Sequence, residues 1–373
     1  SIAIIGAGPA GLTLARLLSL IKPAPSLTIF ERDASPSARF EQGGTLDLGA
    51  ETGQAALRKC GLWETFLKYA RYDGEELIFA DKNWTELVHL GGGAGKSRDR
   101  PEIDRETLKG MLLESVPREC VRWGRKLREV GEDGSLRFDV EGSEEVEGPF
   151  DLVVGADGGW SRVRARLSDV KPRYSGVSGY EMEIKKPGER CPEVDKMVGK
   201  GSFFGSSDRK CLTAQRMGDQ SLKTRSWYLC PEGETKETIE RFGKRGTLDQ
   251  MLRRYEGWAP EMVELYRQGD VERMKEYTLY ELPVGSKWEH TKGFTLIGDA
   301  ASLMTPFGGE GVNKAMKDSL ELTELIEKSM ALSEDLTLDE AVSRYEQAMF
   351  PRAEKIQALT LKSKEWLFSP EAP

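Results

Sequence analysis

A glycine-rich segment near the start of the chain constrains the fold most strongly. The apolar run Ile2–Ile5 leads directly into residues 6–11, which have the spacing GxGxxG, and an apolar helical pattern over 12–18 follows. In such a unit the first glycine permits a tight turn, the second lets a diphosphate approach the backbone, and the third lets the helix pack on the strand. The diphosphate would lie at the helix N-terminus, where unpaired N–H groups favour an anion. We assign to this dinucleotide site Gly6, Gly8, Ala10 and Gly11.

A second strand with an acidic end supports this interpretation. The apolar run Leu27–Phe30 is followed by Glu31, which lies 20 residues after Gly11. A carboxylate at about this distance accepts hydrogen bonds from the adenosine ribose of a bound dinucleotide. A strand, a GxGxxG turn, a helix and a second strand ending in an acid together predict an open α/β domain.

Two later segments repeat the pattern of a buried strand that ends at glycine. The first is residues 150–159, which contain Asp157 and Gly158, and the second is residues 294–301, which contain Gly298 and Asp299. Acids at the carboxyl end of a strand would lie in the crevice where open α/β sheets bind ligands. An amphipathic helix is expected to begin near Val312.

These motifs divide the chain into three parts. Residues 1–80, 102–167 and 282–332 are expected to form one discontinuous, Rossmann-like nucleotide-binding domain. Residues 81–101 and 168–281 are expected to form a second, substrate domain, in which the alternating patterns within 168–281 predict a mostly antiparallel sheet that could cover a ligand. Residues 333–373 are expected to form a long C-terminal bridging helix. The predicted fold class is therefore α/β with an inserted β-sheet domain.

Composition narrows the possible functions. The net charge of -8 argues against nucleic acid as a partner, and no apolar run is long enough to span a membrane. The five cysteines include no CxxC motif and the chain has two histidines, so we expect reduced thiols and no metal site. This scarcity of reactive side chains indicates that a cofactor supplies the chemistry. No signal peptide is visible, and we expect a cytoplasmic monomer that acts on a small molecule.

The three glycine motifs, in this order, resemble those of the class A flavoprotein monooxygenases, the para-hydroxybenzoate hydroxylase-like group. Within that group the chain is most similar to the tetracycline-inactivating monooxygenases and their fungal relatives. This closer likeness lies in residues 43–48, 53–54, 101–108 and 296–313. The resemblance covers nearly the whole chain and implies FAD as the cofactor, with NADPH or NADH as the reductant.

The resemblance also implies roles for individual residues. Glu31 and Arg32 would hold the adenosine ribose, and Asp157 would tie the second motif to both nucleotides. Asp47 and Arg105 would contact FAD near the flavin and its diphosphate. Further residues would bind the ribityl and diphosphate region (Asp299), line the isoalloxazine ring (Pro306, Gly309, Gly311, Val312 and Asn313) and contact NADPH (Arg39).

The implied reaction is hydroxylation of an aromatic or polyketide-like molecule through a flavin hydroperoxide. The sequence demands no particular acid or base, so the catalytic residues are left unassigned. Epoxidation or Baeyer–Villiger oxygen insertion on the same scaffold is an alternative, and a non-catalytic nucleotide-binding protein is another. Glu310 departs from the family pattern, where glutamine is common. A carboxylate there would oppose anionic flavin unless it faces solvent or is protonated.

Overall fold

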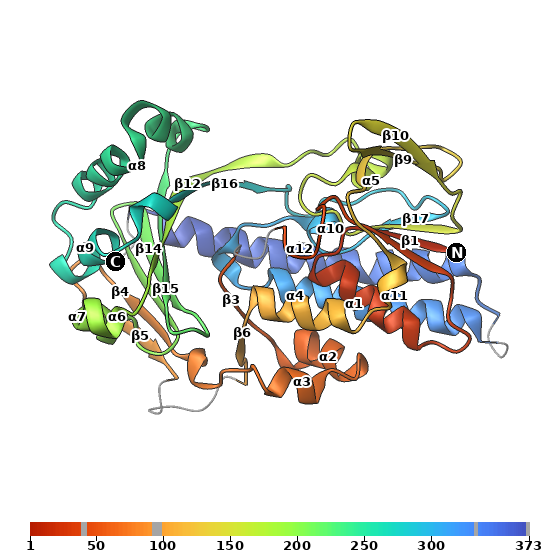
Figure 1. Cartoon of the computed structure of the whole chain (residues 1–373), viewed down its shortest axis with the longest axis horizontal. Coiled ribbons are helices and arrows are strands. Elements are labelled where there is room, and N and C mark those ends of the chain that lie inside the picture. Colours follow the sequence, from red (N-terminus) through yellow and green to blue (C-terminus); the bar gives the residue numbers. More distant parts are fainter. Residues whose placement is uncertain (39–42, 92–98, 332–334, 371–373) are drawn as a thin grey trace.

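The computed structural model describes residues 1–38, 43–91, 99–331 and 335–370. Two large sheets lie next to each other along the long axis of the molecule (Figure 1). One is a five-stranded parallel sheet with the order β17-β11-β1-β2-β7. Its strands are β1 (Ile2–Ile5), β2 (Leu27–Phe30), β7 (Val121–Arg122), β11 (Leu152–Gly155) and β17 (Phe294–Leu296). Every residue of β1 and β11 is buried, as is typical of parallel strands covered on both faces.

The other large sheet has seven strands in the order β16-β12-β15-β14-β13-β4-β5. They are β4 (Leu77–Ala80), β5 (Glu86–Leu90), β12 (Arg173–Ile184), β13 (Ser202–Ser207), β14 (Lys210–Arg216), β15 (Leu222–Leu229) and β16 (Lys275–Glu281). All neighbours pair antiparallel except β13 and β4, which pair parallel. The predicted α/β fold with an inserted, mostly antiparallel sheet is confirmed.

Strand β4 lies in the segment 1–80 that we expected in the nucleotide-binding domain, but it pairs with β13 of the inserted sheet. We therefore propose that the chain passes into the second domain before β4. Two smaller sheets complete the strands. They contain β3 (Thr45–Asp47) with β6 (Glu102–Asp104), and β8 (Lys126–Val130) with β9 (Leu136–Val140) and β10 (Ser143–Glu147).

Helices cover the two large sheets. In the first domain α1 (Pro9–Leu20) packs against α4 (Arg105–Glu114) and α11 (Gly311–Met330). The inserted sheet is covered by α7 (Pro192–Val198), α8 (Glu234–Arg254) and α9 (Pro260–Arg267), on its side away from the first domain (Figure 1). The shorter helices are α2 (Ala55–Lys59), α3 (Trp63–Leu67), α5 (Arg162–Leu167), α6 (Pro187–Arg190) and α10 (Asp299–Ser302).

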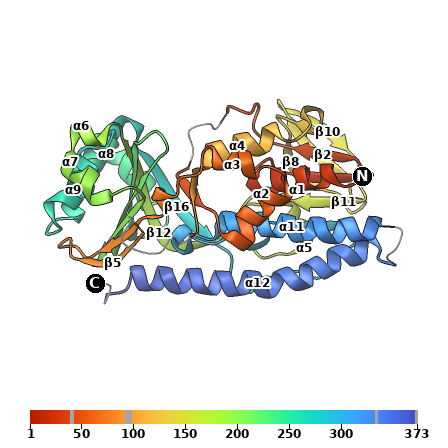
Figure 2. The ribbon, with the colours of Figure 1, turned by 90° about the horizontal axis from the view of Figure 1, so that it is seen from below.

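The last helix, α12 (Leu338–Leu367), connects both domains. It begins with a capping box between Thr337 and Glu340, packs along α11, and extends to the inserted sheet (Figure 2). There Ser206 donates a hydrogen bond to the carbonyl oxygen of Leu367 at 2.7 Å, and Lys364 pairs with Glu281 at 2.8 Å. The long C-terminal helix predicted from the sequence is confirmed. Among the described helices, none is long and apolar enough to cross a membrane.

Candidate functional site

The glycine motifs meet at the carboxyl ends of β1, β11 and β17. A Cβ atom on Gly6 would lie 2.4 Å from the carbonyl oxygen of Ala156, and one on Gly11 would lie 2.0 Å from that of Gly6. Gly6 also has a φ of +111°, which residues with side chains rarely adopt. Gly8 differs, because no atom lies within 4 Å of its ideal Cβ position. Gly6 and Gly11 therefore pack the turn tightly, whereas Gly8 leaves open space at the N-terminus of α1.

Glu31 fixes this turn to the end of β2. Its side chain is buried, and its two carboxylate oxygens accept the backbone N–H groups of Ala7 at 2.7 Å and Asp33 at 2.9 Å. Each carboxylate oxygen can accept a further hydrogen bond, so both retain capacity for a ribose hydroxyl. Arg32, the neighbouring residue expected at the ribose, is exposed.

Asp157 brings a buried acceptor to the same edge of the sheet. Its Oδ2 accepts the backbone N–H of Arg162 at 2.7 Å, while Oδ1 is buried without a hydrogen-bond partner in the described part of the chain. Burial raises the pKa of Asp157, although neighbouring hydrogen bonds oppose the shift. Arg164 donates to the carbonyl oxygens of Gly159 and Ala300, and so ties the second motif to the third.

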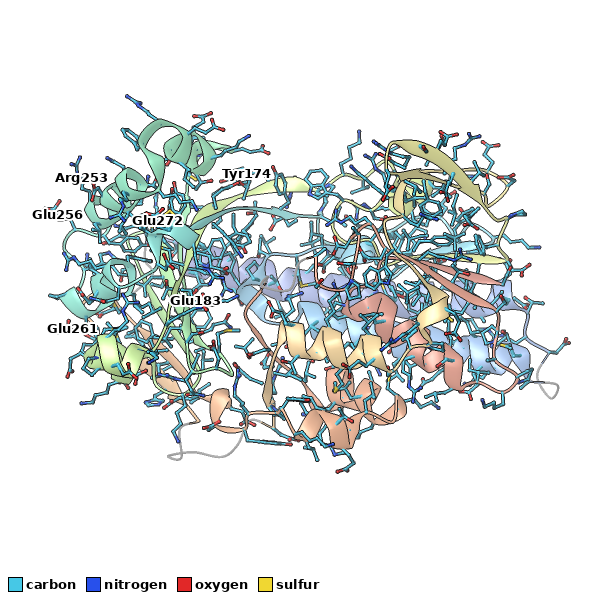
Figure 3. All side chains as sticks on the ribbon, in the orientation of Figure 1. Tyr174, Glu183, Arg253, Glu256, Glu261 and Glu272 are labelled. Atoms are coloured by element: carbon cyan, nitrogen blue, oxygen red, sulfur yellow. The ribbon has the colours of Figure 1, made fainter. Side chains whose placement is uncertain are left out.

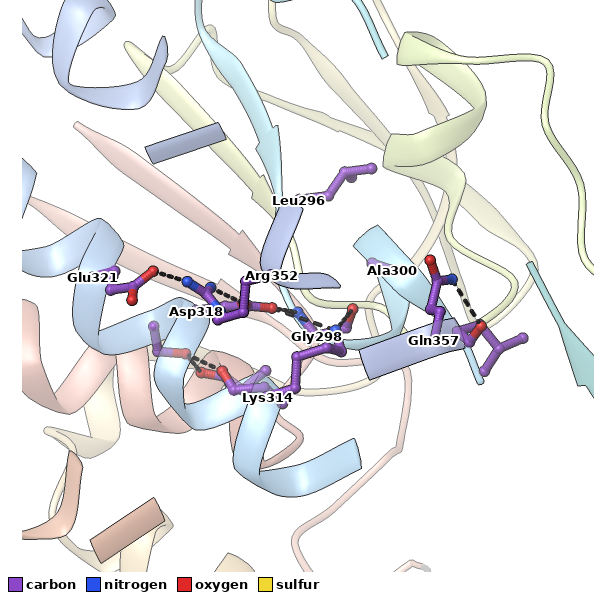
Figure 4. Close-up of polar contacts among 12 residues, drawn as sticks. Leu296, Gly298, Ala300, Lys314, Asp318, Glu321, Arg352 and Gln357 are labelled. Carbon is purple, nitrogen blue, oxygen red and sulfur yellow. Dashed lines mark hydrogen bonds and ion pairs between the residues drawn. The ribbon is translucent and has the colours of Figure 1, made fainter. Parts of the chain in front are cut away.

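The third motif is held by a buried group of charges. The N–H of Gly298 donates to Asp318 at 2.9 Å, and its carbonyl oxygen accepts from Lys314 at 2.8 Å. Arg352 of α12 binds the other carboxylate oxygen of Asp318 at 2.6 Å and also pairs with Glu321. Figure 4 shows these side chains converging on Gly298 from α11 and α12. Both polar groups of the Gly298 backbone are thus fixed by side chains, next to Asp299.

Asn313 joins the start of α11 to the segment that carries Asp47. Its Oδ1 accepts from the Gly49 N–H at 2.8 Å and the Thr52 hydroxyl at 2.9 Å, and its Nδ2 donates to the Asp47 carbonyl oxygen at 2.8 Å. The side chain is fully buried. Asn313 therefore positions the 47–52 segment against the first turn of α11.

Arg100 links Asp47 to Glu310. Its Nε lies 2.9 Å from Oδ2 of Asp47, and its Nη1 donates to Oε1 of Glu310 at 2.7 Å. Burial opposes the charged form of Arg100, but the Glu310 and Asp47 carboxylates outweigh this effect and raise its pKa. The carboxylate of Glu310, the residue that departs from the family pattern, is thus paired with a cation.

Arg105 and Asp299 lie close enough for their charges to interact. The Arg105 side chain packs on Gly43, whose ideal Cβ position lies 2.5 Å from Arg105 Cδ. No hydrogen bond or ion pair joins its guanidinium to another described residue, and Asp299 is exposed. The Arg105 side chain is exposed but lies in a concave cavity, where the surrounding protein lowers its pKa, although the charge of Asp299 opposes the shift. A guanidinium stays charged at physiological pH, so this cation can bind an anionic ligand.

The remaining predicted residues lie on the loop before α11 (Pro306 and Gly309) and in the first turn of α11 (Gly311 and Val312). Pro306 and Gly309 are exposed, Gly311 is half-buried, and Val312 is buried. The ideal Cβ positions of Gly309 and Gly311 meet no atom within 4 Å, so a flat ligand could approach this backbone closely. Arg39, the residue expected to contact NADPH, lies outside the described residues.

The face of the inserted sheet that turns toward the first domain is apolar at one end. Trp227 and Phe204 lie there with Phe307 of the loop before α11, and the Trp227 and Phe307 ring centroids are 6.1 Å apart. Phe368 of the C-terminal segment packs on Phe307 at 5.2 Å. The loop before α11 therefore touches the aromatic part of the sheet directly.

The same face is polar toward its other end. Arg225 donates to Glu181 at 2.8 Å and to Gln215 at 2.7 Å, and Tyr277 donates to Glu181 at 3.4 Å. Beside this group is a cavity of about 360 Å³, lined from the first domain by residues including Arg105. Figure 3 shows Glu183, which also lines the cavity, on this side of the sheet, while Arg253, Glu256 and Glu261 lie on the helix-covered side.

The residues present fit a flavin dinucleotide. Open space over Gly8, the orphaned Asp157 Oδ1, the unpaired Arg105 guanidinium and the open backbone at Gly309 lie around one edge of the sheet. They offer, in turn, a place for a diphosphate, a buried acceptor, a cation and a flat surface. Among the described residues, no group of His, Cys, Asp or Glu is arranged to hold a metal ion.

Sequence reasoning missed several residues that build this site. Arg100 stands 210 residues from Glu310 in the chain, and nothing in the sequence pairs them. Lys314 and Asp318 have the i, i+4 spacing of an ordinary surface pair, yet both are fully buried. The signal that the sequence did offer was the acid at Glu310, which departs from the family pattern.

Comparison with known proteins agrees with this geometry. Residues 1–358 match a family described as an FAD binding domain. The chain is 33% identical to "Monooxygenase asqM" of Emericella nidulans, with 100% of this chain and 96% of that protein covered. It is 34% identical to "Monooxygenase penA" of Penicillium thymicola, with 96% and 93% covered.

Solved structures share the fold at low sequence identity. Klebsiella pneumoniae HpxO, complexed with FAD and uric acid, superposes with a TM-score of 0.78 at 18% identity, covering 99% of this chain and 89% of that one. The tetracycline destructase Tet(51) superposes with a TM-score of 0.67 at 17% identity, covering 99% and 91%. The chain therefore belongs to the FAD binding domain family and, within it, to the class A FAD-dependent monooxygenases.

Proposed function

We propose that this monooxygenase uses NADPH or NADH to hydroxylate an aromatic or polyketide-like small molecule. The observation that carries the proposal is the contact between Phe307 and Trp227, at 6.1 Å between ring centroids. It places the loop before α11, where the flavin ring is expected, directly against an aromatic sheet face. A flat apolar substrate on that face would lie beside the flavin. FAD, when bound, supplies the redox chemistry that activates dioxygen.

The residues of the chain would hold the cofactor in four places. The N-terminus of α1 at Gly8 would bind the diphosphate, and Glu31 would accept hydrogen bonds from the ribose. Arg105 would add a positive charge near the diphosphate. Asp299 would bind the ribityl region, and Gly309 would let the backbone approach the ring.

The protein would also exclude water from the reacting region. Phe204, Trp227, Phe307 and Phe368 belong to one apolar cluster at the junction of the domains. Excluding water from this region protects reactive intermediates from hydrolysis. The polar group of Arg225, Glu181 and Tyr277 would then orient a polar substituent of the substrate.

Anaerobic reduction tests the proposal. The purified protein is loaded with FAD, and the flavin absorbance is followed after adding NADPH or NADH, with and without a panel of phenols and polyketide-like aromatics. Faster bleaching with one compound, followed by one added oxygen atom in its aerobic product, supports a hydroxylase. A product with an epoxide or a ring-expanded ester would instead indicate epoxidation or Baeyer–Villiger insertion. Flavin that neither nucleotide reduces would contradict the assigned reductants.

A further inference from the structure

Glu310 poses an electrostatic problem that Arg100 resolves. Glu310 is the residue that immediately precedes α11, a helix of 20 residues. The N-terminus of such a helix carries partial positive charge, which would stabilise the negative charge that a reduced flavin acquires. An unpaired carboxylate at the same place would cancel that field and repel the reduced cofactor.

We propose that Arg100 is a positioning residue that neutralises Glu310 and, by binding Asp47 as well, sets how strongly the site favours reduced flavin. This inference rests on the proposed placement of the flavin at the loop before α11. The guanidinium fork suits the task, because one planar group reaches two carboxylates in fixed directions. Its contacts are 2.9 Å to Asp47 and 2.7 Å to Glu310.

The contacts of Arg100 also help to hold the 47–52 segment and the loop before α11 in fixed relative positions. Arg100 is held by its own backbone, whose N–H donates to Glu75 at 3.1 Å. Asp47 is held through its carbonyl oxygen by Asn313, three residues after Glu310. Arg100 and Asn313 thus join the 47–52 segment to the loop before α11 from two sides. Loss of the Arg100 fork should loosen that loop and also leave a charge uncompensated.

A charge cycle separates the electrostatic effect from simple loss of structure. The variants are R100Q, E310Q and the double variant R100Q/E310Q, each loaded with FAD. The midpoint potential is measured by spectroscopic redox titration, and FAD affinity by fluorescence. R100Q should lower the potential, since Glu310 then stands unpaired. E310Q should raise it, since Arg100 keeps its charge, and the double variant should return close to the starting value.

The expected size is a tenfold loss of preference for reduced flavin in R100Q, which corresponds to about 30 mV for a two-electron couple. Affinity for oxidised FAD should fall less in R100K than in R100Q, because lysine keeps the charge without the fork. R245Q is the matched control, since Arg245 and Glu272 form an exposed pair on the inserted domain (Figure 3 labels Glu272). It should leave the potential unchanged.

Opposite shifts that cancel in the double variant support the proposal. The proposal would be overturned if R100Q and E310Q shifted the potential in the same direction. It would also be overturned if the double variant R100Q/E310Q kept the lowered potential of R100Q. If R100Q does not fold, E310Q and R100K still decide, because E310Q must raise the potential and R100K must leave it nearly unchanged. Failure of the unsubstituted protein to bind FAD would instead contradict the proposed placement of the cofactor, before any variant is compared.

Discussion

The Lys314 ammonium donates a hydrogen bond to the carbonyl oxygen of Gly298 at 2.8 Å, inside the protein. Both Lys314 and Asp318 are 0% exposed, and Asp318 binds the Gly298 N–H. A charged pair in such a place is costly unless every polar atom is satisfied. Here the cost is offset by holding the backbone before Asp299 in one conformation. The buried pair therefore fixes the backbone of Gly298, next to Asp299 of the proposed cofactor site.

Replacing Asp318 with asparagine should destabilise the protein strongly. D318N leaves Lys314 buried without a counter-charge and removes one of the two carboxylates that pair with Arg352, and breaking a buried pair in this way costs about 3–5 kcal/mol. Urea unfolding with and without FAD measures the change. The matched control is E240Q, because Lys236 and Glu240 form the same i, i+4 pair on the surface, at 71% and 64% exposure. That variant should change stability by about 0.5 kcal/mol or less. Equal effects of the two substitutions would contradict the structural role of Asp318.

The pH dependence of stability near neutrality should come from His290. Burial opposes the charged form of this imidazole, but the Glu346 and Asp339 carboxylates raise its pKa above the ordinary 6.5. Protonated His290 therefore stabilises the folded chain. That contribution is fully present below 6.5 and is lost as the pH rises through the higher folded pKa. Unfolding free energies measured across this window should fall with rising pH.

The variant H290Q should remove most of this slope. The chain has only two histidines, and the other one, His89, also has a raised pKa. The hydrogen bond with Glu76 is the main cause of that shift, and burial opposes it. His89 is more exposed than His290, so solvent screens its interaction and H89Q should remove less of the slope. A slope that persists in H290Q would show that other groups titrate there.

Alanine substitutions at Gly8 and Gly11 of the first motif should have different effects. G8A places a methyl group in open space, so folding without FAD should be unaffected, while FAD affinity should fall at least tenfold because the diphosphate is displaced. G11A forces a methyl group to within 2.0 Å of the Gly6 carbonyl oxygen and should destabilise the apoprotein. Thermal unfolding of the apoprotein and a fluorescence titration with FAD separate the two effects. If G8A and G11A lower the stability of the apoprotein equally, Gly8 has a packing role instead.

The sequence indicates those parts of the proposed site that are local in the chain. Gly6, Glu31 and Asp299 stand at strand ends whose apolar runs and turns are visible in a few residues. The charge partners were hidden, because Arg100 and Glu310 meet only through the fold of the whole domain. Lys314 gave the pattern of an exposed helix pair, since spacing alone does not tell which face of a helix is covered.

The order of aromatic residues along β13 and β15 was also ambiguous in the sequence. Phe203 and Phe204 are neighbours in the sequence, as are Trp227 and Tyr228, and each pair reads alike by residue type. Alternation along a strand places successive side chains on opposite faces, so only one residue of each pair can face the loop before α11. The structure assigns Phe204 and Trp227 to that face and Phe203 to the core under α7–α9.

The neighbours Phe203 and Phe204 should therefore respond differently to substitution by alanine. Phe203 is fully buried in the core of the inserted domain, so F203A should cost about 3–5 kcal/mol of stability. Phe204 is half-buried and stacks on Phe79 at 4.7 Å on the opposite face. F204A should cost less stability, and with the proposed aromatic substrate and NADPH it should raise the substrate KM and the fraction of NADPH consumed without product. Urea unfolding and product yield per NADPH test both variants. Reduced product yield in F203A but not in F204A would place the substrate away from the aromatic face.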